Sequence, residues 1–147
     1  SKLLNYADIV DLCKNTKYLK IGNHSLSHYN LASLDKKDLS NEIEISKKII
    51  SKLPKSKISS VFSIPFGGSY DINDHVVNEI IKSNYKGLLM SRNMINIKHN
   101  IFNYQKLQIP IIERFMPKDI NLKKFKSQLL EVKTKTALKK LINIPKI

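Results

Sequence analysis

The pattern of apolar and polar positions predicts helices and strands that follow one another along the chain. Residues 35–53 form the clearest expected helix, because Leu39, Ile43, Ile50 and Leu53 recur at helical spacing as one apolar stripe. Pro and Gly residues interrupt the other apolar segments, as they do at turns. Further helices are expected at residues 4–14, 73–83 and 121–131, and strands at residues 18–23, 57–64, 86–91 and 107–113.

Strands that alternate with helices are typical of an α/β fold with a mostly parallel sheet or barrel. In such folds functional side chains gather at the carboxyl ends of the strands. His24 and the segment Pro65–Gly67 each follow an expected strand directly. They are therefore expected to be neighbours in space, although about forty residues separate them in the chain. Residues 134–147 are basic and weakly amphipathic, which indicates a last helix or a tail.

The chain is strongly basic, with a formal net charge of +14 over 147 residues. Of its 26 basic residues only Arg92 and Arg114 are arginine, and the lysines are spread along the whole chain. A surface that recognises nucleic acid usually carries more arginine, interleaved with aromatic residues. The charge therefore indicates a solvated basic surface and predicts no specific nucleic-acid partner.

Cysteine content and hydropathy argue against a disulfide-stabilised protein and against a membrane-spanning one. Cys13 is the only cysteine, so an internal disulfide is excluded, and its apolar neighbours Ile9, Val10 and Leu12 predict that it is buried. No apolar stretch approaches the roughly 18 residues that a membrane-spanning helix needs. The amino end contains acidic residues and has no apolar core typical of a signal peptide. These features leave the compartment open.

The stretch IGNHSLSHYNL, residues 21–31, holds two of the four histidines. The segment HSLSHYNLASL, residues 24–34, is expected to form a loop or a single helical turn. His24 and His28 lie four residues apart, a spacing that in a helical turn puts both imidazoles on one face. Zinc accepts such ligands, commonly adds a carboxylate, and keeps one position open for water. The alternative is that both are polar loop residues. His75 and His99 have no comparable neighbours and are expected on the surface.

A second distinctive stretch is FSIPFGGSYD, residues 62–71. It predicts a strand followed by a Pro-Phe-Gly-Gly turn, and Asp71 can begin or cap the next element. An aromatic side chain after a proline suits either the wall of a sugar-sized groove or the packing of the core. The residues by themselves leave both interpretations open.

The two stretches together resemble the motifs of the polysaccharide deacetylases, the NodB-homology carbohydrate esterases. IGNHSLSHYNL is similar to their second motif, His-Ser/Thr-x-x-His, and FSIPFGGSYD resembles their third, in its Pro-Phe-Gly form. The order of the two motifs and the helix between them also match, and SNYKGLLMS is similar to the next strand. The resemblance covers roughly residues 4–130.

This resemblance implies a distorted (β/α) barrel that removes N-acetyl or O-acetyl groups from glycans. A divalent metal, expected to be zinc, would be held by an aspartate and two histidines, and His24 and His28 stand at the histidine positions. Pro65, Phe66 and Gly67 match the turn that forms part of the substrate groove. The implied partner is an acetylated glycan.

The chain also departs from the family pattern. The first motif, Thr-Phe-Asp-Asp-Gly, supplies the general base and the metal carboxylate, but the chain contains no Asp-Asp pair. Ser63 stands where an arginine often opens the third motif, and no histidine follows His99 to serve as the late general acid. We therefore expect a partial deacetylase domain at residues 1–133, with no identifiable catalytic acid or base, followed by the basic segment 134–147.

Three hypotheses about function remain at this point. The first is the carboxyl-terminal portion of a metal-dependent carbohydrate deacetylase, whose open barrel edge would favour self-association. The second is a non-catalytic relative that binds a glycan or a protein. The third is an unrelated basic α/β protein that binds nucleic acid, which depends on net charge alone.

Overall fold

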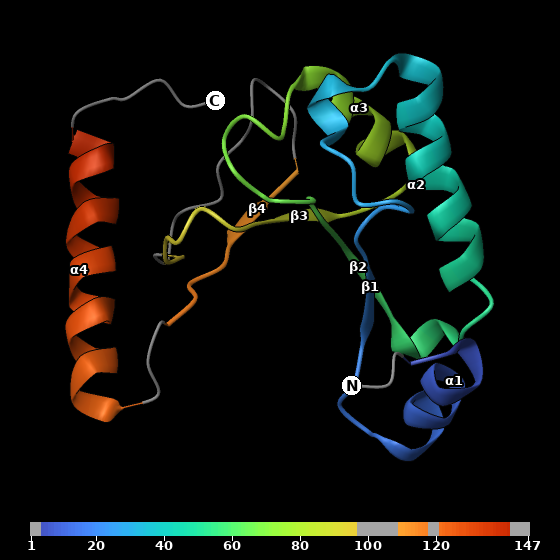
Figure 1. Cartoon of the computed structure of the whole chain (residues 1–147), viewed down its shortest axis with the longest axis horizontal. Coiled ribbons are helices and arrows are strands. Elements are labelled where there is room, and N and C mark those ends of the chain that lie inside the picture. The colour runs from blue at the N-terminus through green and yellow to red at the C-terminus, as the bar shows by residue number, and fades with distance from the viewer. Residues whose placement is uncertain (1–3, 97–108, 118–120, 142–147) are drawn as a thin grey trace.

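The chain folds as an α/β domain around one parallel sheet (Figure 1). The structure, a computed structural model, describes residues 4–96, 109–117 and 121–141. The strands are β1 (Ile21–Asn23), β2 (Ile58–Ser63), β3 (Gly87–Met90) and β4 (Ile111–Glu113). They are hydrogen-bonded in chain order, and every pair is parallel. The predicted α/β class is confirmed, and the described strands form an open sheet and not a closed barrel.

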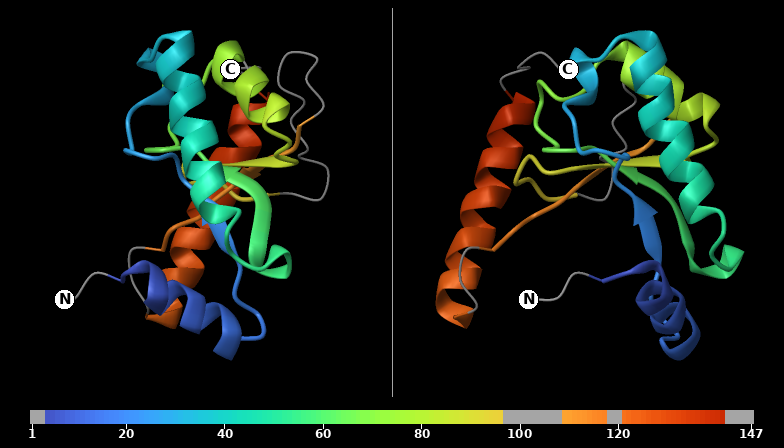
Figure 2. Two further views of the ribbon diagram at one scale, coloured as in Figure 1. Left: turned by 90° about the vertical axis from the view of Figure 1, so that its right-hand side faces the viewer. Right: turned by 45° about the vertical axis from the view of Figure 1, so that its right-hand side comes forward.

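Helices α2 and α3 lie on the same side of the sheet, and α4 lies away from them beyond β4 (Figure 2). The longer helices are α1 (Tyr6–Asn15), α2 (Lys36–Ile50), α3 (Asp74–Lys82) and α4 (Leu122–Leu141), and the short 3₁₀ helices are η1 (Leu31–Ser33) and η2 (Lys55–Lys57). Each of the first three begins and ends close to its expected position. The last helix is longer than the expected 121–131 and continues across residue 133, where we expected the domain to end.

The core fills the space between the sheet and helices α2 and α3. The apolar stripe of α2 is buried at Leu39 and Ile43, and it meets the fully buried Phe62 and Leu88 of the sheet. By contrast, α4 leaves the side chain of Leu122 65% exposed, although this helix also carries apolar residues. The hydrophobic core is therefore built mainly by β2, β3, β4, α2 and α3, with η1 and adjoining loop residues. Its buried members are Leu31, Leu39, Ile43, Phe62, Ile64, Ile72, Val76, Val77, Ile80, Leu88, Met90, Ile109 and Ile111.

The carboxyl ends of the four parallel strands lie at the same edge of the sheet. Asn23, Ser63, Met90 and Glu113 are the last residues of β1 to β4. Because all four strands run in the same direction, the segments that follow them start from the same edge of the sheet. This confirms the expectation that the stretch after Asn23 and the stretch after Ser63 are neighbours.

The amino cap of α3 also ties that helix to η1. Asn73 Oδ1 accepts from the Val76 backbone N–H at 3.0 Å, and Asn73 Nδ2 donates to the Ala32 carbonyl at 3.2 Å. We expect Asn73→Ala to lower the free energy of unfolding by about 1–2 kcal/mol, because an uncapped helix start leaves backbone donors unpaired. Urea denaturation measures this. Asn78→Ala, at an exposed position of the same helix, is the control, and equal losses would contradict the capping role.

Cys13 is 2% exposed, as its apolar neighbours predicted. No helix in residues 4–96, 109–117 and 121–141 is long and apolar enough to cross a membrane. Strand β1 lies at the edge of the described sheet, and its pairing with a second copy stays a prediction.

Candidate metal centre

The loop after β1 brings the imidazole rings of His24 and His28 together. The ring centroids are 4.8 Å apart and the ring planes meet at 82°. Of the two forms that the sequence allowed for this stretch, a loop or a single helical turn, residues 24–28 take the irregular loop. Ser25 and His28 take left-handed backbone conformations with φ of 65° and 58°, which are uncommon for residues other than glycine. The two rings converge because the loop reverses at these residues and not because of helical spacing.

A hydrogen bond to the sheet orients the His24 imidazole. His24 Nδ1 lies 2.9 Å from the carbonyl oxygen of Ser63, the last residue of β2. A carbonyl oxygen only accepts, so Nδ1 is the donor and carries the ring proton. In the neutral ring the lone pair is then on Nε2. Metal-binding histidines in proteins are commonly held in this way, by a second hydrogen bond that selects the tautomer.

The aromatic residue of the second motif packs against the second histidine. The rings of Phe66 and His28 are 4.8 Å apart and meet at 74°, and the Phe66 side chain is 60% exposed. Phe66 is therefore not a core residue, which was one of the two interpretations left open above. Pro65 and Gly67 on either side of it are buried. The turn thus presents one exposed aromatic ring next to the histidine pair.

Gly67 allows this turn to lie directly against the end of β3. Its N–H donates to the Pro65 carbonyl at 2.6 Å, and its own carbonyl accepts from Ser91 N–H at 2.8 Å. Its φ is +72°, and a Cβ at this position would lie 2.6 Å from the Ser91 nitrogen. A glycine is therefore required both by the conformation and by the space.

Asp71 joins the histidine loop, residues 24–30, to the Pro-Phe-Gly turn, residues 65–67. Its Oδ1 accepts from Asn30 Nδ2 at 2.9 Å, and its Oδ2 accepts from Gly68 N–H at 2.7 Å. The sequence indicated only that Asp71 could begin or cap the next element, and the helix cap is in fact Asn73. The carboxylate links the two motifs, so they form one continuous surface.

Three buried polar residues that were not among the expected site residues, Asn23, Glu42 and Ser46, hold the base of the histidine loop. Asn23 is 1% exposed, donates from Nδ2 to Ser46 Oγ and Tyr85 OH, and accepts from Ser25 N–H. Glu42, which is 7% exposed, accepts from the backbone N–H groups of the same loop. The signal that could have revealed them is Ser46, a polar residue at a core position in the apolar stripe of α2.

A comparison with protein-family models identifies the family. Residues 2–88 match the model described as Polysaccharide deacetylase. The chain belongs to the polysaccharide deacetylase family. The matched segment contains both motifs, strands β1 and β2, and the first half of β3. No curated protein and no solved structure matches the chain.

This member of the deacetylase family brings two imidazole side chains, His24 and His28, together at the site. In the part of the chain that the structure describes, no three histidine, cysteine, aspartate or glutamate side chains are grouped so that they could hold a metal ion. His75 is exposed on α3, as expected, and His99 lies outside the described residues. The two imidazoles fit a zinc ion in type and proximity, and a third protein ligand would have to come from elsewhere.

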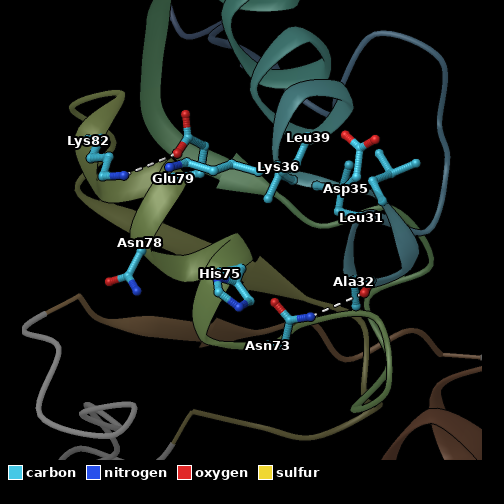
Figure 3. Close-up of a pocket in the computed structure, with 11 residues that line it drawn as sticks. Leu31, Ala32, Asp35, Lys36, Leu39, Asn73, His75, Asn78, Glu79 and Lys82 are labelled. Atoms are coloured by element: carbon cyan, nitrogen blue, oxygen red, sulfur yellow. Dashed lines mark hydrogen bonds and ion pairs between the residues drawn. The ribbon is translucent and has the colours of Figure 1, made fainter.

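The deacetylase domain also has a shallow crevice that is separate from the histidine pair (Figure 3). It encloses about 490 Å³ between η1, the start of α2, and α3. No residue of the histidine loop or the Pro-Phe-Gly turn lines it. Its exposed His75 therefore serves as a control for experiments on the histidine pair.

Both arginines of the chain form contacts within the domain. Arg92 pairs with the buried carboxylate of Glu113 at the end of β4, and Arg114 Nη2 donates to Ser91 Oγ at 2.9 Å. The side-chain amide of Asn96 makes two hydrogen bonds to the backbone of Glu113. Nδ2 donates to the Glu113 carbonyl at 2.8 Å, and Oδ1 accepts from the Glu113 N–H at 2.9 Å. These contacts hold the β3 and β4 ends of the sheet edge together.

The contacts of Glu42 with the histidine loop make the free energy of unfolding depend on pH in the acid range. Burial raises the pKa of its carboxyl, but hydrogen bonds from Ser27, Leu26 and Ser25 outweigh burial and hold the pKa below its usual range. The native state therefore binds this proton less readily than the unfolded chain. The resulting stabilisation is present at neutral pH and is lost as the pH falls below about 4.5 and through the native pKa.

We expect Glu42→Gln to reduce this loss, so that unfolding free energy falls less steeply between neutral pH and the acid limb. Urea denaturation at a series of pH values measures the slope. Glu44→Gln removes a charge from an exposed position of the same helix and is the control. Parallel curves for the wild type and Glu42→Gln would contradict the prediction.

Proposed function

We propose that this chain supplies the histidine ligands and part of the substrate groove of a metal-dependent carbohydrate deacetylase. The reaction is the hydrolysis of N-acetyl, or O-acetyl, groups on a glycan. His24 and His28 are the proposed ligands of a divalent metal, with zinc as the first candidate. Pro65, Phe66 and Gly67 are the proposed groove wall.

One observation carries the proposal. In a chain of the polysaccharide deacetylase family, the His24 and His28 rings lie 4.8 Å apart at the carboxyl edge of the sheet, and His28 is in turn 4.8 Å from the exposed ring of Phe66. Imidazoles that converge next to an exposed aromatic ring suit a metal site that opens onto a sugar. When bound, a divalent metal lowers the pKa of water and polarises an acetyl carbonyl.

The residues of this chain prepare the site in three ways. The Ser63 carbonyl keeps the proton of His24 on Nδ1, which leaves Nε2 free to bind. Phe66 restricts the His28 ring by its edge-to-face contact. Tyr29, 59% exposed and adjacent to His28 in the chain, adds apolar surface of the kind that stacks on a sugar ring.

Calorimetric titration of zinc into the metal-free chain tests the proposal directly. We expect saturable binding of about one zinc per chain, because the two imidazoles form one site. Heats no larger than those of a buffer blank would contradict a metal site in this chain. The identity of the metal is then compared by repeating the titration with cobalt(II) and nickel(II).

The groove wall is tested with oligomers of N-acetylglucosamine. We expect Phe66→Ala to weaken their binding to the zinc-loaded chain several-fold, because an exposed ring that can stack on sugar is lost. Tyr18→Ala removes an aromatic ring that is 87% exposed before β1 and is the control. Equal affinities of the two variants for the oligomers would contradict the proposed role of Phe66 in the groove wall.

A non-catalytic relative that binds a glycan or a protein is the second candidate. It is favoured by the site itself, where the described residues offer two imidazoles and no third ligand. Acetate release distinguishes the two candidates. Zinc-dependent release from acetylated glycans supports the enzyme, and glycan binding without release supports the binding module.

A further inference from the structure

We propose that Glu42 is a positioning residue for the histidine pair: from α2 it holds the loop in the conformation in which His24 and His28 converge. This inference depends on the proposed metal site for its functional consequence. The contacts that support it are independent of any metal.

The carboxylate of Glu42 binds the middle of the histidine loop. A single oxygen, Oε2, accepts from the backbone N–H groups of Leu26 at 2.9 Å and Ser27 at 2.8 Å. Two successive N–H groups that converge on one anion form a backbone nest. Both amides lie between the two histidines, so the position of the carboxylate determines the path of the chain that joins them.

The loop needs this support because its own conformation is unfavourable. Ser25 and His28 both have positive φ, at 65° and 58°. Such residues persist where contacts from the surrounding structure impose the conformation. The local bonds, from Ser25 N–H to Asn23 at 2.9 Å and from His28 N–H to Ser25 Oγ at 3.1 Å, are between uncharged groups. Hydrogen bonds to a carboxylate are roughly twice as strong as these.

Helix α2 presents Glu42 together with Ser46, one helical turn further along. Ser46 is 4% exposed and accepts from Asn23 Nδ2 at 2.9 Å, at the residue where β1 ends. One face of α2 therefore fixes both the start of the loop and its middle. Because α2 is itself packed into the core through Ile43, this support is rigid.

Glu42→Gln tests the proposal, because the amide has nearly the same shape as the carboxylate and lacks its charge. We expect zinc affinity, measured by calorimetry at neutral pH, to fall about tenfold or more, as for other groups that orient metal ligands. Cobalt(II) absorption gives a spectroscopic signature, and we expect its visible bands to change in this variant. Glu44→Gln, on the exposed side of the same helix, is expected to leave both readouts unchanged.

A metal-free readout separates this proposal from the proposed function. In the wild type we expect slow hydrogen exchange at the Leu26 and Ser27 amides, and at least tenfold faster exchange in Glu42→Gln. Faster exchange in a chain that binds no zinc would support the loop anchor and contradict the metal site. Unchanged exchange, or a lower melting temperature with unchanged zinc affinity, would overturn the positioning role.

Discussion

His24→Ala and His28→Ala are each expected to weaken zinc binding by more than about 100-fold. Each variant leaves one imidazole where two now converge, and the described residues provide no third side chain to replace the lost ligand. Groups that only orient a ligand already change metal affinity by about 10–100-fold, so removing a ligand costs more. Calorimetric titration of the metal-free proteins measures the difference.

His75→Ala is the matched control for both variants. His75 is also an exposed histidine, but it lines the crevice of α3, away from the loop. We expect it to bind zinc as the wild type does. Circular dichroism should show all three variants to be folded, because each removed side chain is exposed. Equal weak binding by all four proteins would mean that the histidine pair forms no metal site.

Gly67→Ala is expected to destabilise the domain by roughly 2–4 kcal/mol. The left-handed conformation at φ +72° is unfavourable for alanine, and the new Cβ would lie 2.6 Å from the Ser91 nitrogen and 2.7 Å from the Ser91 Cβ. The backbone of β3 would have to move away from the turn to make room. The move would break the hydrogen bond from Ser91 N–H to the Gly67 carbonyl.

Gly22→Ala separates this steric effect from the general cost of replacing glycine. Gly22 lies in β1, and a Cβ there would meet its nearest atoms at 3.8 Å and 3.9 Å, which are ordinary contact distances. We expect its unfolding free energy, from urea denaturation, to stay close to that of the wild type. A Gly67→Ala variant as stable as Gly22→Ala would show that the turn does not need glycine.

Local sequence signals were sufficient for most of the secondary structure. The apolar stripe of α2, and the prolines and glycines that interrupt the chain, predicted the position of each α-helix and strand through β3 within a few residues, but not the 3₁₀ helix η2. Helix α4 was the exception. It is longer than expected and leaves Leu122 and Leu130 largely exposed, so its apolar residues were a poor guide to its length.

Some features of the site likewise followed from local sequence, and others depend on residues that are far apart in the chain. Spacing along the chain paired His24 with His28, and the parallel sheet implied that the Pro-Phe-Gly turn lies beside them. The sequence left open whether a loop or a helical turn pairs the two rings. The structure has the loop, whose left-handed backbone at Ser25 and His28 depends on contacts from distant residues. Asp71 illustrates the same limit, since its partner Asn30 is 41 residues away in the chain.

The amino-acid sequence thus decided the α/β class, the family and the residue types at the site, because these follow from local periodicity and short motifs. Tertiary structure decided how the site is assembled. The tautomer of His24 depends on the Ser63 carbonyl of a neighbouring strand, and the loop depends on Glu42 of the next helix. Hydrogen bonds between residues far apart in the chain have no periodicity, so only the folded backbone reveals them.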